Sequence, residues 1–394
     1  MNMIDYLKWR GDLTFSQSEF NEVDNLLLCY LIYVNLDGVA PGEGESPITI
    51  RELSERFFGK YGEEELKKDK SFIRFAPAVL HEMAKTSRFG TLRVKNYVNK
   101  IDLEKMLQFA AMEICLSDDS SFIAYRGTDD TIVGWKEDFF LSRGKVLAEE
   151  EAVSYLNRVG MSARKTILDK LFPERYASKS VKLRIGGHSK GGHLAIHAAA
   201  YCDLDIQDRI LEVYSNDGPG FLQNVENDCK LQAVRKKVKR IVPEYSVIGM
   251  LMNPVCDPVI VRSTQKTIMQ HDGFSWEVEG PAFVKVKELS NFSVVLDEAI
   301  RAWLDGIPEW QREAVIQDLF AVLEATGAET LTELQDGGMK NFRILVKRID
   351  GMDSESKIIL QDLLKEIVQR VPQLLGMSER IGGIKKRNET DSAL

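Results

Sequence analysis

One stretch of the sequence constrains the fold more than any other: VKLRIGGHSKGGHLAIHAAAY, from Val181 to Tyr201. It begins with an apolar run typical of a strand, passes a serine flanked by glycines, and continues with small residues typical of a helix. A sharp turn from strand to helix requires glycine at both flanks, because side chains there would collide as the two elements approach each other. The stretch therefore predicts a strand–turn–helix unit with Ser189 at the turn.

The turn itself matches the pattern G-x-S-x-G, from Gly187 to Gly191. In this geometry the serine hydroxyl stands above the carboxyl edge of a sheet, where it can act as a nucleophile. The backbone N–H of Lys190 is then aimed at a developing oxyanion near the start of the helix. The pattern is weak by itself, but the strand before it and the helix after it supply the context that it requires. The alternative is a structural turn with an incidental serine.

A nucleophilic serine needs a base, and the chain has only five histidines. His188 lies on the turn itself, while His193 and His197 lie on the helix that follows it. In the α/β-hydrolase order of serine, acid and histidine, the base comes from a separate loop further along the chain. Only His271, in MQHDGFSW, satisfies that order. We therefore expect His271 to be the base for Ser189.

The acid of such a triad has two candidates. Asp217, in YSNDGPGF, follows a predicted strand and lies in a Gly/Pro turn. Glu244, in IVPEYSVIGM, ends the next strand, which is the more usual place for this role. Either carboxylate can fix the tautomer of the histidine and stabilise its charged form. The sequence favours Asp217 slightly, leaves Glu244 open, and allows a turn-capping role for each.

A metal site is the main competing interpretation of this region. His193 and His197 are four residues apart, as are the two zinc ligands of H-E-x-x-H. The residues between them are LAI, however, so the glutamate of that motif is missing and no third ligand follows. We expect two histidines packed on a helix, with neither a metal nor a cofactor.

The rest of the chain around this stretch alternates between strand and helix patterns. Helices are predicted over residues 149–171, 191–201 and 225–238. Strands are predicted over residues 91–98, 109–117, 121–127, 182–185, 210–214, 238–243 and 257–263. The second and third of these strands flank a polar DDS turn and predict a hairpin. Regular alternation of this kind predicts an α/β fold with a mostly parallel central sheet.

Helical patterns lie on both sides of this region. With 394 residues the chain exceeds the ~250–300 residues that one hydrophobic core usually serves. We expect an N-terminal helical segment over residues 1–75, a catalytic domain over 76–290, and a helical extension over 291–394 that forms a lid or an oligomer surface. The spacings Ser16–Glu19 and Thr49–Glu52 predict capping boxes at the starts of two N-terminal helices.

Composition excludes several classes of function. The net charge of −8 gives no electrostatic footprint for nucleic acid. The longest apolar run, Leu26–Val34, is far too short to span a bilayer, and the charged N-terminus does not fit a signal peptide. Five scattered cysteines fit a reducing compartment. We expect a cytoplasmic protein that acts on a small molecule or lipid, and the sequence leaves its oligomeric state open.

Two motifs together give the chain a resemblance to a known family. FIAYRGTDDTIVGWKEDF, over residues 122–139, and IGGHSKGGHLA, over residues 185–195, resemble the class 3 lipases, a branch of the α/β-hydrolase superfamily. The phrases QFAAMEICL, NDGPGF and QHDGFSW look closer still to a bacterial family of lipase-like serine hydrolases. The resemblance runs from the N-terminus to about residue 280. It implies an α/β-hydrolase fold and the hydrolysis of carboxylic esters through an acyl-enzyme.

The resemblance also implies roles for single residues. Ser189 corresponds to the lipase nucleophile, and Thr128 corresponds to the residue that faces the oxyanion. Asp138 matches the aspartate after the lipase tryptophan, and we expect it to pair with Arg126 and brace the Thr128 loop. His188 is the histidine of the lipase G-H-S-x-G elbow and is expected to support it.

One departure from the lipase pattern concerns the acid. Lipases carry an aspartate after the penultimate strand, where this chain has Ser246 in EYSVIGML. The acid therefore stays open between Asp217 and Glu244. The departure also motivates an alternative function, a hydrolase-fold protein with weak or lost activity that serves as a binding or scaffold module.

Overall fold

The computed structural model describes residues 1–62, 75–102, 107–128, 147–162, 181–221, 224–291, 293–294, 307, 309–327, 337–352 and 356–362. By its internal contacts the chain divides into two compact units. The first covers Met1–Asp130 and Leu141–Leu289, and the second contains Ser290–Leu394. The elements that surround Ser189 belong to the first unit.

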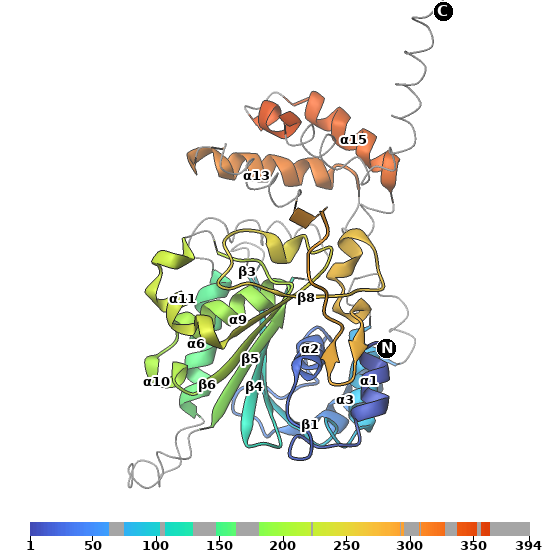
Figure 1. Cartoon of the computed structure of the whole chain (residues 1–394), viewed down its shortest axis with the longest axis vertical. Coiled ribbons are helices and arrows are strands. Elements are labelled where there is room, and N and C mark those ends of the chain that lie inside the picture. Colours follow the sequence, from blue (N-terminus) through green and yellow to red (C-terminus); the bar gives the residue numbers. More distant parts are fainter. Residues whose placement is uncertain are drawn as a thin grey trace, which may run out of the picture. The chain divides into compact units, whose positions relative to one another are not determined.

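A central sheet forms the middle of the first unit (Figure 1). Its strands follow one another in sequence order, antiparallel from β1 to β4 and parallel from β4 to β8. The strands are β1 Ile48–Thr49, β2 Arg93–Asp102, β3 Leu107–Cys115, β4 Ser120–Tyr125, β5 Lys182–His188, β6 Ile210–Asn216, β7 Val238–Pro243 and β8 Val259–Val261. The predicted α/β fold with a mostly parallel central sheet is thereby confirmed.

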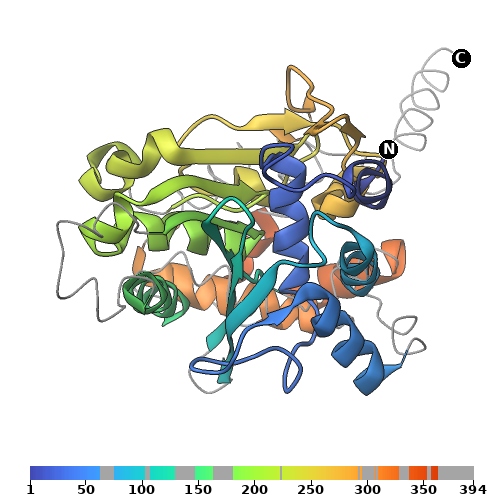
Figure 2. The same ribbon diagram turned by 90° about the horizontal axis from the view of Figure 1, so that it is seen from below.

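Helices cover both faces of this sheet. One group, drawn in shades of blue in Figure 2, comprises α1 Met3–Arg10, α2 Glu22–Leu31, α3 Ile50–Tyr61 and α4 Ala76–Lys85. The other, drawn from green to yellow-green, comprises α6 Leu147–Ser162, α9 Lys190–Tyr201, α10 Leu204–Gln207 and α11 Cys229–Val234. Strand β4 shows the division, because successive side chains of a strand point to opposite faces. Phe122 and Ala124 join the core that contains α2, whereas Ile123 and Tyr125 join the core that contains α9.

Two adjacent glycines in β5 let a helix approach the strand from each face. A Cβ added at Gly186 would lie 2.6 Å from Oδ1 of Asn25 in α2. A Cβ added at Gly187 would lie 2.1 Å from the backbone carbon of Gly191 in α9. Both distances are too short for any side chain, so the sequence GG is what allows α2 and α9 to pack against the end of β5.

The remaining elements of the first unit are short. They are the 3-10 turns η4 Val225–Asn227, η5 Arg235–Lys237, η6 Ile248–Met250, η7 Thr267–His271 and η8 Gly273–Ser275, and the two-stranded ribbon of β9 Val278–Glu279 with β10 Ala282–Phe283. The turns η7 and η8 carry the segment around His271. In the second unit, α13 Glu309–Glu324 and α15 Gly338–Asp350 share a small apolar core that includes Val315 and Ile349.

Several local predictions are confirmed. Strands β3 and β4 form the predicted hairpin through a turn in which Asp119 has φ 60°. At the start of α3, Thr49 accepts a hydrogen bond from the Glu52 N–H, and the Glu52 carboxylate accepts one from the Thr49 N–H. This is the predicted capping box.

Two local predictions are wrong. The box at Ser16–Glu19 does not start a helix, because Asn21 and Asp24 form the box that begins α2. The helix predicted over 225–238 is reduced to α11, since the Asp228 side chain caps a new start by accepting from the N–H groups of Lys230 and Leu231. The chain then tightens into η5 before β7.

The N-terminal region is tied together by one buried arginine. The guanidinium of Arg88 is fully buried and donates to both carboxylate oxygens of Asp24, at 2.8 and 2.5 Å. It also donates to the backbone carbonyls of Leu13, Thr14, Ser18 and Glu19. Arg88 thereby satisfies the polar groups of the loop that leads into α2 and holds that helix in place.

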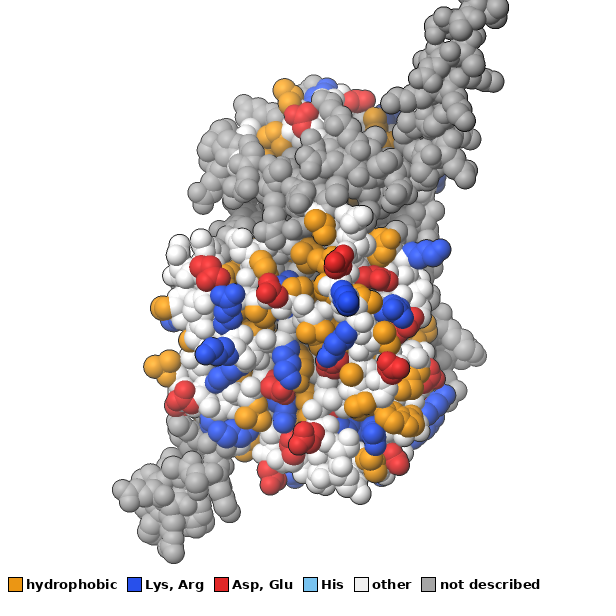
Figure 3. Space-filling model, viewed as in Figure 1, with side chains coloured by type: hydrophobic (Ala, Val, Ile, Leu, Met, Phe, Trp, Pro, Cys, Tyr) orange, Lys and Arg blue, Asp and Glu red, His pale blue; other side chains and the backbone are white. Residues whose placement is uncertain are grey.

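No helix in the described ranges is long and apolar enough to cross a membrane. On the face shown in Figure 3, Lys and Arg side chains are interspersed with Asp and Glu side chains over the described surface.

Replacing Arg88 tests how much the first unit depends on this interaction. Arg88→Met leaves the Asp24 carboxylate buried without its partner, and breaking a buried pair in this way typically costs about 3–5 kcal/mol. We expect urea unfolding to show a loss of that size. Lys85→Met, which removes an exposed pair with Glu82, is the control and should change the free energy of unfolding by less than about 1 kcal/mol. Equal effects of the two substitutions would contradict the assignment.

Candidate active site

The turn at Ser189 has the strained geometry predicted from the sequence. Strand β5 ends at His188, α9 begins at Lys190, and Ser189 between them has φ 57° and ψ −133°. Such a backbone costs a residue other than glycine about 1–3 kcal/mol and persists only where its surroundings enforce it. Gly191 supplies part of that enforcement, because a Cβ there would lie 2.2 Å from the Tyr125 carbonyl oxygen.

The segment after β4 passes directly beside this turn. Tyr125 of β4 pairs with Gly187 of β5 in parallel register, so the next residues continue past His188 and Ser189. Gly127 is pressed against the turn, since a Cβ there would lie 2.3 Å from the His188 carbonyl oxygen. Thr128 follows and is buried. Thr128, the oxyanion residue predicted from the sequence, thus follows a residue that contacts the Ser189 turn.

Asp217 and His271 meet in a buried pair. The Nδ1 atom of His271 lies 2.6 Å from Oδ2 of Asp217, and the Asp217 side chain is fully buried. The other carboxylate oxygen accepts from the Ser246 hydroxyl at 2.5 Å and from the Gly249 N–H at 3.1 Å. Asp217 has φ 49°, a conformation that aspartate tolerates better than most residues. These contacts fix the carboxylate on the Nδ1 side of the histidine.

This arrangement distinguishes the two acid candidates. Asp217, which follows β6, is the carboxylate that pairs with His271. Glu244 follows β7, is partly exposed, and donates its backbone N–H to the Val261 carbonyl. The Ser246 hydroxyl donates to Asp217.

His188 connects the turn at Ser189 to the His271 segment. Its Nε2 lies 2.7 Å from the His271 carbonyl oxygen, and the two imidazole rings are 4.6 Å apart between centroids. Burial, with a smaller contribution from the nearby His271, lowers the pKa of His188 to about 3. His188 is therefore neutral at pH 7 with its proton on Nε2, since a carbonyl oxygen can only accept. The Tyr33 hydroxyl lies 3.2 Å from Nδ1 on the other side of the ring.

Helix α2 supplies contacts that the sequence analysis missed. Asn25 donates to Oδ1 of Asn216, which precedes Asp217, at 2.8 Å, and Asn216 donates to the Gly187 carbonyl at 3.0 Å. The Tyr30 hydroxyl donates to Asp272, which follows His271, at 2.5 Å. The available signal was Asn25 just before the apolar run Leu26–Val34 and Tyr30 within it, and neither indicates its partner.

The two helix histidines lie beside one carboxylate, and His193 is hydrogen-bonded to it. Nε2 of His193 lies 2.8 Å from Oε1 of Glu149 in α6, and Nε2 of His197 lies 3.7 Å from the other oxygen. The Nδ1 atom of His193 lies 2.9 Å from the Gly220 carbonyl oxygen. Within the described ranges there is no group of three or more His, Cys, Asp or Glu side chains arranged to hold a metal ion. These contacts tie α6 and α9 to the turn that follows Asp217.

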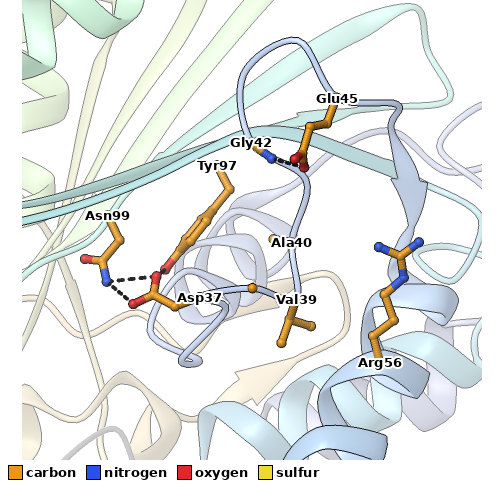
Figure 4. A pocket seen from close by; sticks show the side chains of 9 residues that line it. Asp37, Val39, Ala40, Gly42, Glu45, Arg56, Tyr97 and Asn99 are labelled. Carbon is orange, nitrogen blue, oxygen red and sulfur yellow. Dashed lines mark hydrogen bonds between the residues drawn. The ribbon is translucent and has the colours of Figure 1, made fainter.

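Of the two residues expected to brace the Thr128 loop, Arg126 and Asp138, the structure describes only Arg126. Asp138 lies outside the described residues. Arg126 donates to Oδ1 of Asn99 at 2.8 Å, and Asn99 donates to both carboxylate oxygens of Asp37. Asp37 also accepts from the Tyr97 hydroxyl and lines a surface pocket of about 400 Å³, with Arg56 on the opposite side of the pocket (Figure 4).

Lys190, the first residue of α9, has a buried side chain, which the sequence did not predict.

Comparisons with known proteins identify a family for the chain and two similar solved structures. The model of the Mbeg1-like family matches residues 83–321, which is more than half of the chain. No curated protein matches it. Among solved structures, the chain is similar to M37 lipase, with 19% identity, 58% of this chain and 69% of that chain covered, and a TM-score of 0.35. It is also similar to the Rhizomucor miehei lipase propeptide complex, with 17% identity, coverages of 67% and 82%, and a TM-score of 0.31.

The close approach at Gly191 gives one testable expectation. Gly191→Ala places a methyl group against the Tyr125 carbonyl, and overpacking of this kind typically costs about 1–3 kcal/mol. We expect that loss in urea unfolding. Gly59→Ala is the matched control, because Gly59 lies in α3 with nothing near its Cβ position, and alanine there should add about 0.5–1 kcal/mol. A Gly191→Ala protein as stable as the wild type would show that the turn is not tightly packed.

The buried histidines predict a loss of stability in mild acid. Burial lowers the pKa of His188 to about 3 and that of His197 to about 4. The unfolded chain takes up these protons below its ordinary pKa of about 6.5, whereas the folded chain does not. The free energy of unfolding should therefore fall as the pH drops from 6.5 to 5, by up to about 1.4 kcal/mol per pH unit for each histidine.

Urea unfolding at several pH values measures this slope. His197→Gln should retain the contribution of His188 and lose that of His197, so its slope should be shallower than that of the wild type. Identical slopes in the two proteins would contradict the account.

Proposed function

The chain belongs to the Mbeg1-like family, and from that membership and the geometry around Ser189 we propose that it is a serine hydrolase of carboxylic esters that works through an acyl-enzyme. The observation that carries this proposal is the buried pair of His271 and Asp217 beside a strained serine turn. Within the proposed triad, both Ser189 and Asp217 have a left-handed backbone, with a positive φ that is uncommon for residues other than glycine. Strain of this kind clusters at functional sites.

In the proposed reaction, His271 acts as the general base. Asp217 holds the proton on Nδ1, so Nε2 is the nitrogen that takes the hydroxyl proton of Ser189. The alkoxide attacks the ester carbonyl carbon, and the tetrahedral intermediate collapses as the imidazolium gives its proton to the departing alcohol. Water activated by the same histidine then releases the acid from Ser189.

The oxyanion is assigned to two backbone donors. The N–H of Lys190 lies at the start of α9, where the helix dipole favours negative charge. The N–H of Thr128 is the second donor, supported by the passage of the β4 extension beside the turn. Losing one such donor typically costs about 2.7–4 kcal/mol of transition-state stabilisation.

Asp217 is the acid in this proposal, although class 3 lipases carry theirs after the following strand. The hydroxyl of Ser246, which occupies that position, donates to Asp217. The proposed acid thus follows β6 rather than β7, and the residue after β7 that replaces the lipase aspartate supports it with a hydrogen bond. The substrate is a small-molecule or lipid ester, the class implied by the lipase resemblance.

Paired substitutions of the two acid candidates test the assignment. Asp217→Asn should lower kcat for a p-nitrophenyl ester by about 10⁴-fold, because the amide favours the wrong tautomer of His271. Glu244→Gln should stay within about two-fold of the wild type, as expected for a side chain outside the machinery. His271→Ala should abolish turnover in a folded protein. A fully active Asp217→Asn or His271→Ala variant would refute the triad.

A further inference from the structure

The segment that carries His271 packs against helix α2 in one apolar core, which includes Trp276 and Leu26. The Tyr30 side chain is fully buried. Its hydroxyl donates to Oδ1 of Asp272 at 2.5 Å and accepts from the Phe274 N–H at 2.9 Å. One hydroxyl group thus binds two residues of the turn that begins immediately after His271.

Asp272 directly follows His271 in the chain and is held by further hydrogen bonds. Its carboxylate caps η8 by accepting from the Phe274 N–H, and its carbonyl accepts from the Ser275 hydroxyl. On the other side of His271, the Gln270 carbonyl accepts from the indole N–H of Trp276. Both chain neighbours of His271 are thus held by hydrogen bonds, and Tyr30 supplies one of those of Asp272.

The same helix also fixes the acid side of the pair. Asn25, five residues before Tyr30 in α2, binds the Asn216 side chain at 2.8 Å. Asn216 immediately precedes Asp217, and its carbonyl accepts from the Ser189 N–H at 2.9 Å. Helix α2 therefore contacts the direct chain neighbours of both Asp217 and His271.

We propose that Tyr30 is a positioning residue for His271, and that α2 is a part of the active site. The proposal rests on the function proposed above. Tyr30 lies outside residues 83–321, the range matched by the family model, so the site extends beyond that range. Misplacing a catalytic group by about 1 Å can cost on the order of 10²-fold in rate, and a hydroxyl that fixes the turn after the base can exert such an effect.

Tyr30→Phe removes only this hydroxyl, and Tyr6→Phe is its matched control. Tyr6 is also fully buried and its hydroxyl donates to a buried carboxylate, Asp24, in the same helical layer. For ester hydrolysis we expect Tyr30→Phe to lower kcat by about 10–100-fold with KM changed by less than about two-fold. Tyr6→Phe should keep the wild-type kcat.

A second readout does not depend on activity. The His271 Nδ1 proton, hydrogen-bonded to Asp217, should give a downfield proton NMR signal that is absent from Asp217→Asn. We expect this signal to be lost or broadened in Tyr30→Phe and retained in Tyr6→Phe. An unchanged signal together with wild-type kcat in Tyr30→Phe, or equal losses in both variants, would overturn the proposal. A wild-type protein that hydrolyses no ester would refute the proposed function, while the NMR comparison would still decide the role of Tyr30.

Discussion

The whole candidate site depends on the absence of side chains at the end of β5. Gly186 admits α2 on one face of the sheet, and Gly187 with Gly191 admits α9 on the other. Both helices approach the strand closely, and Ser189, which joins β5 to α9, takes a left-handed backbone. The energy for that strain comes from the packing of the surrounding core.

The pair of Asp217 and His271 is assembled on the same edge from two further turns. Asp217 leaves β6 and is held by Ser246 and Gly249, while His271 is held through its carbonyl by His188. In the proposed triad, Ser246 therefore supports the acid, and the Asp217 carboxylate lies at Nδ1 of the histidine, where the chemistry requires it.

Sequence patterns predicted those parts of the fold that depend on contacts between residues close together in the chain. The G-x-S-x-G turn, its strand and its helix were readable from Gly187–Gly191, because sterics alone require glycine there. The shortage of histidines singled out His271 as the candidate base, and the structure pairs it with Asp217. The sequence favoured Asp217 over Glu244 only slightly, since the choice depends on how two turns converge in space. Tyr30 was missed because its partner, Asp272, is 242 residues away, and no local pattern encodes such a pairing.

The central claim is that Ser189 is an activated nucleophile. Labelling the purified protein with a fluorophosphonate, read by intact mass and peptide mapping beside a Ser189→Ala control, tests it most directly. The account predicts one adduct, located on Ser189 and absent from the control. A folded wild-type protein without an adduct, or an adduct that persists in Ser189→Ala, would contradict it and favour a hydrolase fold used for binding.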